Sequence, residues 1–171
     1  RQFVLTERTT RSGRRLGLMA LVDLAAYDYT PGSRPLIRPT EGTVVSRLPA
    51  RVRVRSGAAL ELPHLMLLAD DPQRTLIEPL YAQREKFEKL YDFELMLGGG
   101  HLRGWAVDDA DGVLAAMDRL PSLQGDDPIL FAVGDGNHSL AAARKCWLEC
   151  PTERNRYMLA EVVNLYDESL R

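Results

Sequence analysis

An abrupt change of composition at residues 131–147, FAVGDGNHSLAAARKCW, constrains the fold more than any other feature of the sequence. Three apolar residues lead into GDGNHS at 134–139, and an alanine-rich segment follows. Glycine and aspartate are poor strand and helix residues, but glycine permits a tight turn and a close backbone approach to a ligand. We therefore expect a strand over 129–133, a turn, and a helix over 140–149.

The rest of the chain predicts an α+β fold, a mixed sheet with flanking helices in a single domain over 1–171. Residues 2–9 and 14–22 predict a hairpin with its turn at 10–13, and the apolar second strand is typical of a central, doubly covered strand. Thr40 predicts a helix start, and Pro49 breaks that helix or starts a second one. Residues 52–55 fit a strand or a helix. Further segments are predicted as strands over 64–69 and 157–165, an amphipathic helix over 73–91, a hairpin of 92–97 with 102–107, and a helix over 111–120.

Composition limits the classes of function. The 171 residues carry a net charge of −2, so no overall basic field favours nucleic acid or an anionic membrane. No apolar run approaches the roughly 18 residues that a membrane helix requires. Cys146 and Cys150, four apart on a predicted helix, are expected to be reduced, which favours a cytoplasmic setting. Because the chain starts at Arg1 rather than methionine, we expect a fragment of a longer protein.

A strand that ends in glycines and opens a helix presents backbone N–H groups to an anion, most often a phosphate. Gly134 and Gly136 allow the close approach, and Ser139 can cap the helix or donate to a phosphate oxygen. Asp135 can hold a metal or accept a proton, and His138 can act as an acid, a base or a ligand. The spacing matches neither a Walker A loop nor G-x-G-x-x-G. The alternative interpretation is an ordinary turn with a helix cap.

A second motif, LIRPTEGT at 36–43, supplies further candidates. Arg38 is a candidate phosphate clamp, Glu41 a candidate general base, and Thr40 and Thr43 are candidate donors to an anion. The alternative is a helix cap with a surface ion pair.

An arginine stripe follows the second motif, with Arg47, Arg51 and Arg55 on one helical face and Arg53 off it. Because no aromatic residues are interleaved, nucleic acid is an unlikely partner. His64 is interpreted as structural, although a metal site of Asp135, His138 and a nearby acid is conceivable. His101 is interpreted as a hairpin-turn residue.

Three motifs in order, IRPTEGT, ELPHLMLLADDP and GDGNHSLAAA, resemble the bacterial family known as domain of unknown function 1015. That family is similar to the ParB/sulfiredoxin superfamily, whose strand-to-helix loop binds nucleotide phosphates. Free-serine kinases of the superfamily transfer phosphate from a nucleotide to a small hydroxyl substrate. The resemblance implies ATP or ADP with Mg²⁺ as cofactor. It places Asp135, Gly136 and His138 on the D-G-x-H positions of the loop.

The chain departs from that pattern at two loop positions. Many relatives read D-G-H-H-R, whereas this chain has Asn137 and Ser139 in place of the first histidine and the arginine. The bidentate phosphate clamp is therefore missing, unless Arg144 or an arginine from 34–55 replaces it. Three hypotheses stand: a nucleotide-dependent phosphotransferase, which is favoured, a non-catalytic nucleotide or metabolite sensor, and, less favoured, a nucleic-acid-binding domain.

Overall fold

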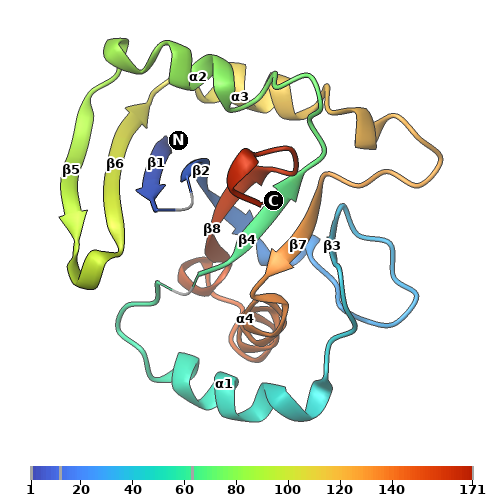
Figure 1. Ribbon diagram of the computed structural model, residues 1–171. Coiled ribbons are helices and arrows are strands. Elements are labelled where there is room, and N and C mark those ends of the chain that lie inside the picture. The colour runs from blue at the N-terminus through green and yellow to red at the C-terminus, as the bar shows by residue number, and fades with distance from the viewer. Residues whose placement is uncertain (1, 12, 63, 171) are drawn as a thin grey trace.

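The computed structural model describes residues 2–11, 13–62 and 64–170 and contains one eight-stranded mixed sheet (Figure 1). The strands lie in the order β3-β7-β4-β8-β2-β1-β6-β5. They are β1 Phe3–Thr10, β2 Gly13–Asp23, β3 Ile37–Pro39, β4 Met66–Ala69, β5 Lys89–Leu95, β6 Gly100–Val107, β7 Phe131–Asp135 and β8 Tyr157–Asn164. The α-helices of the described residues are α1 Leu48–Ser56, α2 Glu78–Ala82, α3 Ala110–Met117 and α4 Asn137–Glu149. The α+β class predicted from the sequence is confirmed.

The antiparallel part of the sheet contains both predicted hairpins. β2 pairs with β1 on one side and with β8 on the other, so the second strand is central, as predicted. It is not covered on both faces, because Leu21 on β2 is 64 % exposed. β5 and β6 form the other hairpin, and β6 also pairs with β1.

The other part of the sheet brings the two polar motifs together. β3 runs parallel to β7, with Ile37 opposite Phe131 and Pro39 opposite Val133. Parallel strands end at the same edge of a sheet, so the segment 40–44 after β3 lies beside the residues that open α4. The candidate site lies at this edge of the sheet, where two motifs that are distant in the sequence meet.

Strand alternation separates a large apolar core from a more polar sheet face. Leu5 pairs with both Leu18 and Trp105, and Leu18 pairs with Val162, so these side chains share the buried face. The residues between them, which include Thr6, Gly17, Gly104 and Glu161, point to the opposite face. Helix α1 packs on α4 through Leu48, Ala141 and Ala142, and the two helices lie side by side in Figure 1.

Two predicted helices are wrong. No helix starts at Thr40, because 37–39 join the sheet as β3 and the helix α1 begins only at Leu48, with Pro49 in its first turn. The helix predicted over 73–91 is reduced to α2 and a short 3₁₀ turn before β5. Asp71 explains the late start, since its carboxylate accepts from the backbone N–H groups of Thr75 and Leu76, at 2.7 and 2.8 Å, which favours a turn over a helix.

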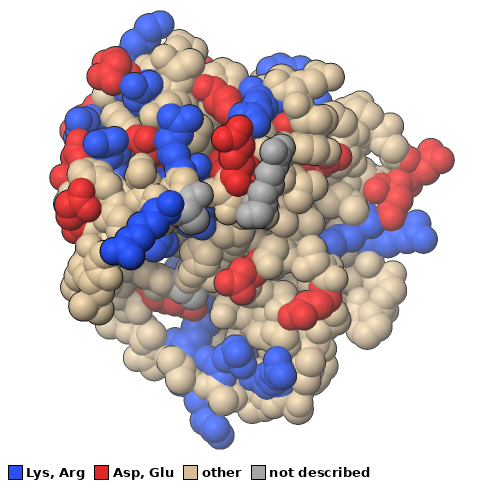
Figure 2. Space-filling view, viewed as in Figure 1, with Lys and Arg blue, Asp and Glu red and all other residues tan. Residues whose placement is uncertain are grey.

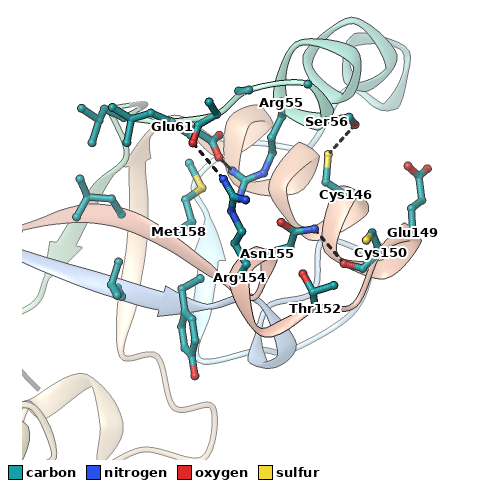
Figure 3. A pocket seen from close by; sticks show the side chains of 18 residues that line it. Arg55, Ser56, Glu61, Cys146, Glu149, Cys150, Thr152, Arg154, Asn155 and Met158 are labelled. Atoms are coloured by element: carbon teal, nitrogen blue, oxygen red, sulfur yellow. Dashed lines mark hydrogen bonds and ion pairs between the residues drawn. The ribbon is translucent and has the colours of Figure 1, made fainter.

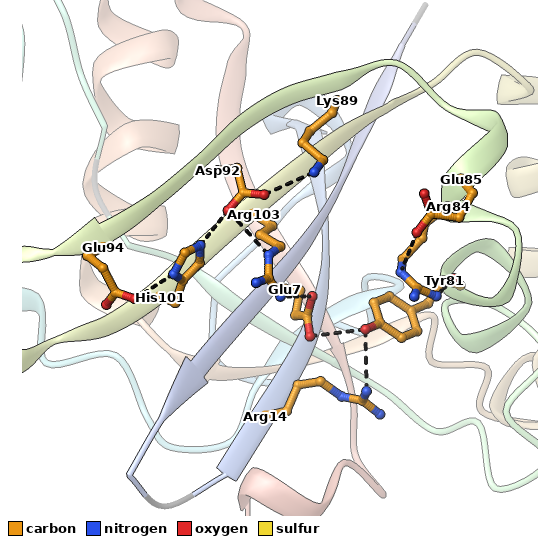
Figure 4. A network of polar contacts seen from close by, with 10 residues as sticks. All are labelled: Glu7, Arg14, Tyr81, Arg84, Glu85, Lys89, Asp92, Glu94, His101 and Arg103. Atoms are coloured by element: carbon orange, nitrogen blue, oxygen red, sulfur yellow. Dashed lines mark hydrogen bonds and ion pairs between the residues drawn. The ribbon is translucent and has the colours of Figure 1, made fainter.

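His101 lies in strand β6 and not in the hairpin turn, which corrects the prediction from sequence. Its Nδ1 is 2.7 Å from Glu94 Oε1 and its Nε2 is 2.5 Å from Asp92 Oδ1 (Figure 4). Arg103 continues the network to the buried Glu7, whose carboxylate also accepts from the Tyr81 hydroxyl of α2. The hydrogen bonds to Glu94 and then Asp92 raise the pKa of His101. The network thus joins β5, β6, β1 and α2.

Candidate functional site

The turn from β7 into α4 is shaped so that only glycine fits at its centre. Gly136 has a φ of +89°, in the left-handed region, and it is the N-cap of α4. A Cβ at this position would lie 2.8 Å from the His64 carbonyl oxygen and 3.3 Å from Leu65 Cα. Asp135 steadies the turn, because its Oδ1 accepts from the Gly136 N–H at 2.8 Å. Gly134 is also constrained, as a Cβ there would press on Leu68 at 2.9 Å.

Helix α4 begins without a side-chain cap. Serine, threonine, aspartate or asparagine at the N-cap would accept from the N–H groups of the first turn, but Gly136 has no side chain to do so. The first intrahelical bond runs from Leu140 N to Gly136 O at 3.0 Å. Like any first turn, that of α4 has backbone N–H groups without intrahelical partners at the positive end of the helix dipole. Such a terminus is suited to an anion.

The segment 40–44 is tied to α4 by residues of both motifs. Asn137 Nδ2 donates to the Glu41 carbonyl at 3.4 Å, and Val44 N–H donates to His138 Nε2 at 3.1 Å. Thr40 Oγ1 donates to the Val133 carbonyl at 2.9 Å. Asn137 and His138 are both buried. His138 Nε2 is thus the acceptor that holds Val44 beside the start of α4.

The other residues of the second motif point in different directions. Arg38 places its guanidinium on Asp127, with Nη1–Oδ2 and Nη2–Oδ1 both at 2.7 Å, and it also donates to the carbonyls of Pro35 and Pro128. The Arg38 hydrogen bond lowers the pKa of Asp127. A guanidinium so occupied holds the 126–128 loop and is not free to clamp a phosphate. Glu41 is exposed. Thr43 and Tyr27 each have a buried hydroxyl without a hydrogen-bond partner among the described residues, and burial raises the pKa of Tyr27 to about 12.

A chain of polar side chains runs from Asp135 along the sheet. His64 Nδ1 is 3.7 Å from Asp135 Oδ2, and His64 Nε2 is 3.2 Å from Glu161 Oε2. Arg15 binds the same Glu161 with two hydrogen bonds of 3.0 and 3.3 Å. Glu161 is almost fully buried, whereas His64 is half exposed. The His64 side chain therefore lies between two carboxylates, Asp135 and Glu161.

Glu161 and Arg15 were not identified from the sequence, although one signal was available. Glu161 is the only charged residue in the strand YMLAEVVN, and a lone acid in an otherwise apolar central strand needs a partner. Arg15 gives no comparable signal, because charged residues are common near hairpin turns.

Two arginines of the 34–55 cluster lie on α1, the helix that packs on α4. Arg51 and Arg55 line a hollow of about 440 Å³ together with Ser139. Arg55 is paired with Glu61, while Arg51 is exposed and donates to the Arg47 carbonyl at 3.1 Å. Figure 2 shows basic side chains gathered at the lower edge, where α1 lies in Figure 1. Arg144 points elsewhere, since its Nη1 donates to the Leu24 carbonyl at 2.6 Å.

A larger groove of about 890 Å³ lies on the far side of α1, between the segment 57–62, the end of α4 and the start of β8 (Figure 3). Cys146 and Cys150 line it and are free thiols, as predicted. Several of the polar groups that line the groove have hydrogen-bond partners within the protein. Cys146 Sγ is 3.7 Å from Ser56 Oγ, and Asn155 Nδ2 donates to the Cys150 carbonyl at 3.1 Å. The groove lies at the end of α4 opposite Gly136, away from the two polar motifs.

Comparison with known proteins identifies the family. The family described as "Protein of unknown function (DUF1015)" matches residues 1–171. The chain belongs to the DUF1015 family. No curated protein and no solved structure matches the chain significantly. The DUF1015 description names no activity, so the function has to be inferred from the geometry of the site.

The described part of this DUF1015 chain contains no group of three or more His, Cys, Asp and Glu side chains placed to hold a metal ion. Asp135, the predicted metal ligand, has one carboxylate oxygen on the Gly136 N–H and the other turned to His64. Its side chain is 74 % exposed. Within the described ranges, no helix combines the length and apolar character that crossing a bilayer requires.

Proposed function

We propose that this DUF1015 chain binds the phosphate group of a nucleotide, or of another small phosphorylated compound, at the first turn of α4. The observation that carries the proposal is the direct start of α4 at Gly136, without a side-chain cap and at the edge where β3 and β7 end. Backbone N–H groups in such a position favour a phosphate oxygen, and ligands of open α/β sheets bind at the carboxyl ends of strands. Gly134, Gly136, Asn137 and Ser139 are the loop residues of this site.

Arg51 supplies the cation that the loop itself lacks. It lines the same hollow as Ser139, and an exposed arginine on α1 can swing to a phosphate held at the neighbouring helix end. Arg55 is less available because Glu61 neutralises it. In this proposal Arg51 takes the place of the loop arginine of ParB/sulfiredoxin-like proteins, and Arg38 keeps the loops in position.

Asp135 is the side chain best placed to share a Mg²⁺ ion with the phosphates of ATP or ADP. Magnesium is commonly bound through one or two carboxylates plus substrate phosphates, and it retains water in its other positions. A nucleotide-borne ion therefore requires no cage of protein ligands. In this proposal Mg²⁺ strengthens nucleotide binding but does not bind the chain alone.

Phosphate transfer is the second candidate, and the position of His64 favours it. The His64 imidazole lies between two carboxylates, with Nε2 3.2 Å from Glu161 Oε2 and Nδ1 3.7 Å from Asp135 Oδ2, and it adjoins the turn that opens α4. In a transfer reaction, a substrate hydroxyl would lose its proton to His64 while its oxygen attacks the terminal phosphate, and ADP would leave. Glu41 is the other candidate base, but its carboxylate is exposed. Without transfer, the same site is a sensor.

Calorimetric titration with ADP and ATP, with and without Mg²⁺, tests binding at this site. We expect Arg51→Gln to weaken binding about tenfold, because it removes one charge-assisted hydrogen bond. Arg53→Gln is the matched control, since Arg53 lies on the same helix but does not line the hollow. An equal loss of nucleotide affinity in both variants would mean that binding depends only on the general charge of α1. That result would contradict the proposed site. Strong salt dependence with nucleic acid instead would favour the third hypothesis.

Release of labelled phosphate or ADP over time separates an enzyme from a sensor. If the chain transfers phosphate, His64→Gln abolishes turnover and leaves ADP binding within twofold, while Glu41→Gln retains turnover. Loss of turnover in Glu41→Gln alone would make Glu41 the base. Binding without turnover in the unsubstituted chain would identify a sensor. The free cysteines and the nucleotide ligand are both consistent with a cytoplasmic protein, which we propose as its location.

A further inference from the structure

We propose a second binding site, a hollow on the polar face of the sheet that takes a small carboxylate with an aromatic or branched apolar body. The hollow has a volume of about 400 Å³ and lies over β8, β2, β1, β6 and β5. Ligand sites of small molecules begin at roughly 300 Å³. The hollow shares His64 with the site proposed at α4, but its ligand is held by Arg8 and requires no nucleotide.

Two glycines let side chains of the lining pack close to the sheet. Thr6 of β1 is paired with Gly17 on one side and with Gly104 on the other. A Cβ on Gly17 would lie 2.7 Å from Thr6 Oγ1 and would also strike the Glu161 carboxylate. A Cβ on Gly104 would coincide with the ring of Tyr91. The glycines thus let Glu161 and Tyr91 lie close over the sheet as opposite walls.

Among the described charged residues that line the hollow, Arg8 is the cation available to a ligand. Arg15 and His64 both bind Glu161, so that carboxylate is satisfied within the protein. Arg8 also lines the hollow, and its Nη2 donates to the Gly99 carbonyl at 3.3 Å. Its Nε is buried and has no hydrogen-bond acceptor among the described residues. Because an unsatisfied buried donor is costly, Arg8 favours an incoming acceptor, and a carboxylate is the best match.

The rest of the lining is apolar and selects the body of the ligand. Met19, Leu95 and Leu102 surround the ring of Tyr91. Burial, and next the nearby Glu161 charge, raise the pKa of Tyr91, so its phenol stays neutral. A carboxylate on Arg8 therefore has apolar surface within reach. Inorganic phosphate lacks a body that can bury this surface, which distinguishes the hollow from the first turn of α4.

Ligand-observed NMR with phenylacetate tests this site, with benzyl alcohol as a neutral analogue of similar size. We expect saturable binding of phenylacetate in the millimolar range, and binding of benzyl alcohol that is weaker by about tenfold. Arg8→Gln is expected to remove most of the difference between the two compounds. The control Arg14→Gln, one residue before Arg15 and directed at Tyr81 instead, is expected to change phenylacetate affinity less than twofold.

A variant that narrows the hollow keeps the test decisive if Arg8→Gln does not fold. Leu95→Trp adds volume to a lining side chain and leaves the Arg8 guanidinium in place, and we expect it to abolish phenylacetate binding in a chain with native circular dichroism. No saturable phenylacetate binding by the folded, unsubstituted chain would overturn the proposal, as would equal binding of the two compounds. ADP titrations report on α4 separately, so the failure of one site is distinguishable from the failure of the other.

Discussion

Replacement of Gly136 by alanine tests whether the turn before α4 has the shape described here. A left-handed conformation costs a non-glycine residue roughly 1–2 kcal/mol, and the lower entropy of the unfolded chain returns about 0.4–1 kcal/mol. The new Cβ would also meet the His64 carbonyl oxygen at 2.8 Å, and both atoms belong to or adjoin the backbone. Overpacking of this kind costs about 1–3 kcal/mol. We therefore expect Gly136→Ala to lower the free energy of unfolding by about 2–4 kcal/mol.

Gly32→Ala is a control that isolates the steric part of this effect. Gly32 has a φ of +85°, close to that of Gly136, but a Cβ there would meet nothing within 4 Å. We expect a loss of only about 0.5–1.5 kcal/mol at Gly32. Urea unfolding at 25 °C, followed by circular dichroism, gives both values. If the two variants differ by less than about 0.5 kcal/mol, the close approach of His64 to Gly136 is wrong, because the backbone penalty is the same in both.

Three further outcomes follow from other parts of the molecule. The raised pKa of His101 means that its pairing with Glu94 and Asp92 stabilises the fold fully below a pH of about 6.5 and less as the pH rises through the folded pKa. The difference in melting temperature between the native chain and His101→Gln should therefore shrink from pH 5.5 to 8.5, and a constant difference would contradict the network. Tyr27 has a pKa raised to about 12 and should therefore ionise last in an ultraviolet titration of the tyrosines. The fold should lose stability between about pH 10 and 12, and Tyr27→Phe should remove the late step of the titration. Arg38→Gln should speed hydrogen exchange in 37–44 while leaving that of β1 unchanged, because Arg38 anchors this segment to Asp127.

The sequence predicts best those elements whose pattern is local. Alternating or continuous apolar runs with clear turn residues predict the two hairpins, the strands β4, β7 and β8, and the helix α4. The segment 73–91 shows the limit of this reasoning. Its apolar spacing fits a helix, but the Asp71 carboxylate holds the preceding backbone in a turn, and residues 89–95 pair with β6 instead. Local hydrogen bonds of the Asp71 side chain and the pairing of β5 with β6 together outweigh a weak helical preference.

The candidate site is only partly predictable, because its parts are distant in the sequence. Both polar motifs were identified, but their pairing depends on the parallel contact of β3 with β7, which no local pattern indicates. For the same reason, the sequence does not show that Arg38 pairs with Asp127, or that Arg51 and Ser139 line the same hollow. Glu161 and His64 come from segments separated by 97 positions, and their contact is visible only in the fold.

Backbone amide shifts during a titration with ADP and Mg²⁺ test the central claim most directly. In ¹⁵N-labelled protein, a phosphate at the start of α4 predicts the largest shift changes at the amides of residues 137–139, since their N–H groups face the anion. Gly98, in the connection between β5 and β6 at the other end of the sheet, serves as an internal reference with little change. Saturating ADP that shifts other regions and leaves 137–139 unchanged would contradict a phosphate site at α4. The absence of any shift in the folded chain would do the same.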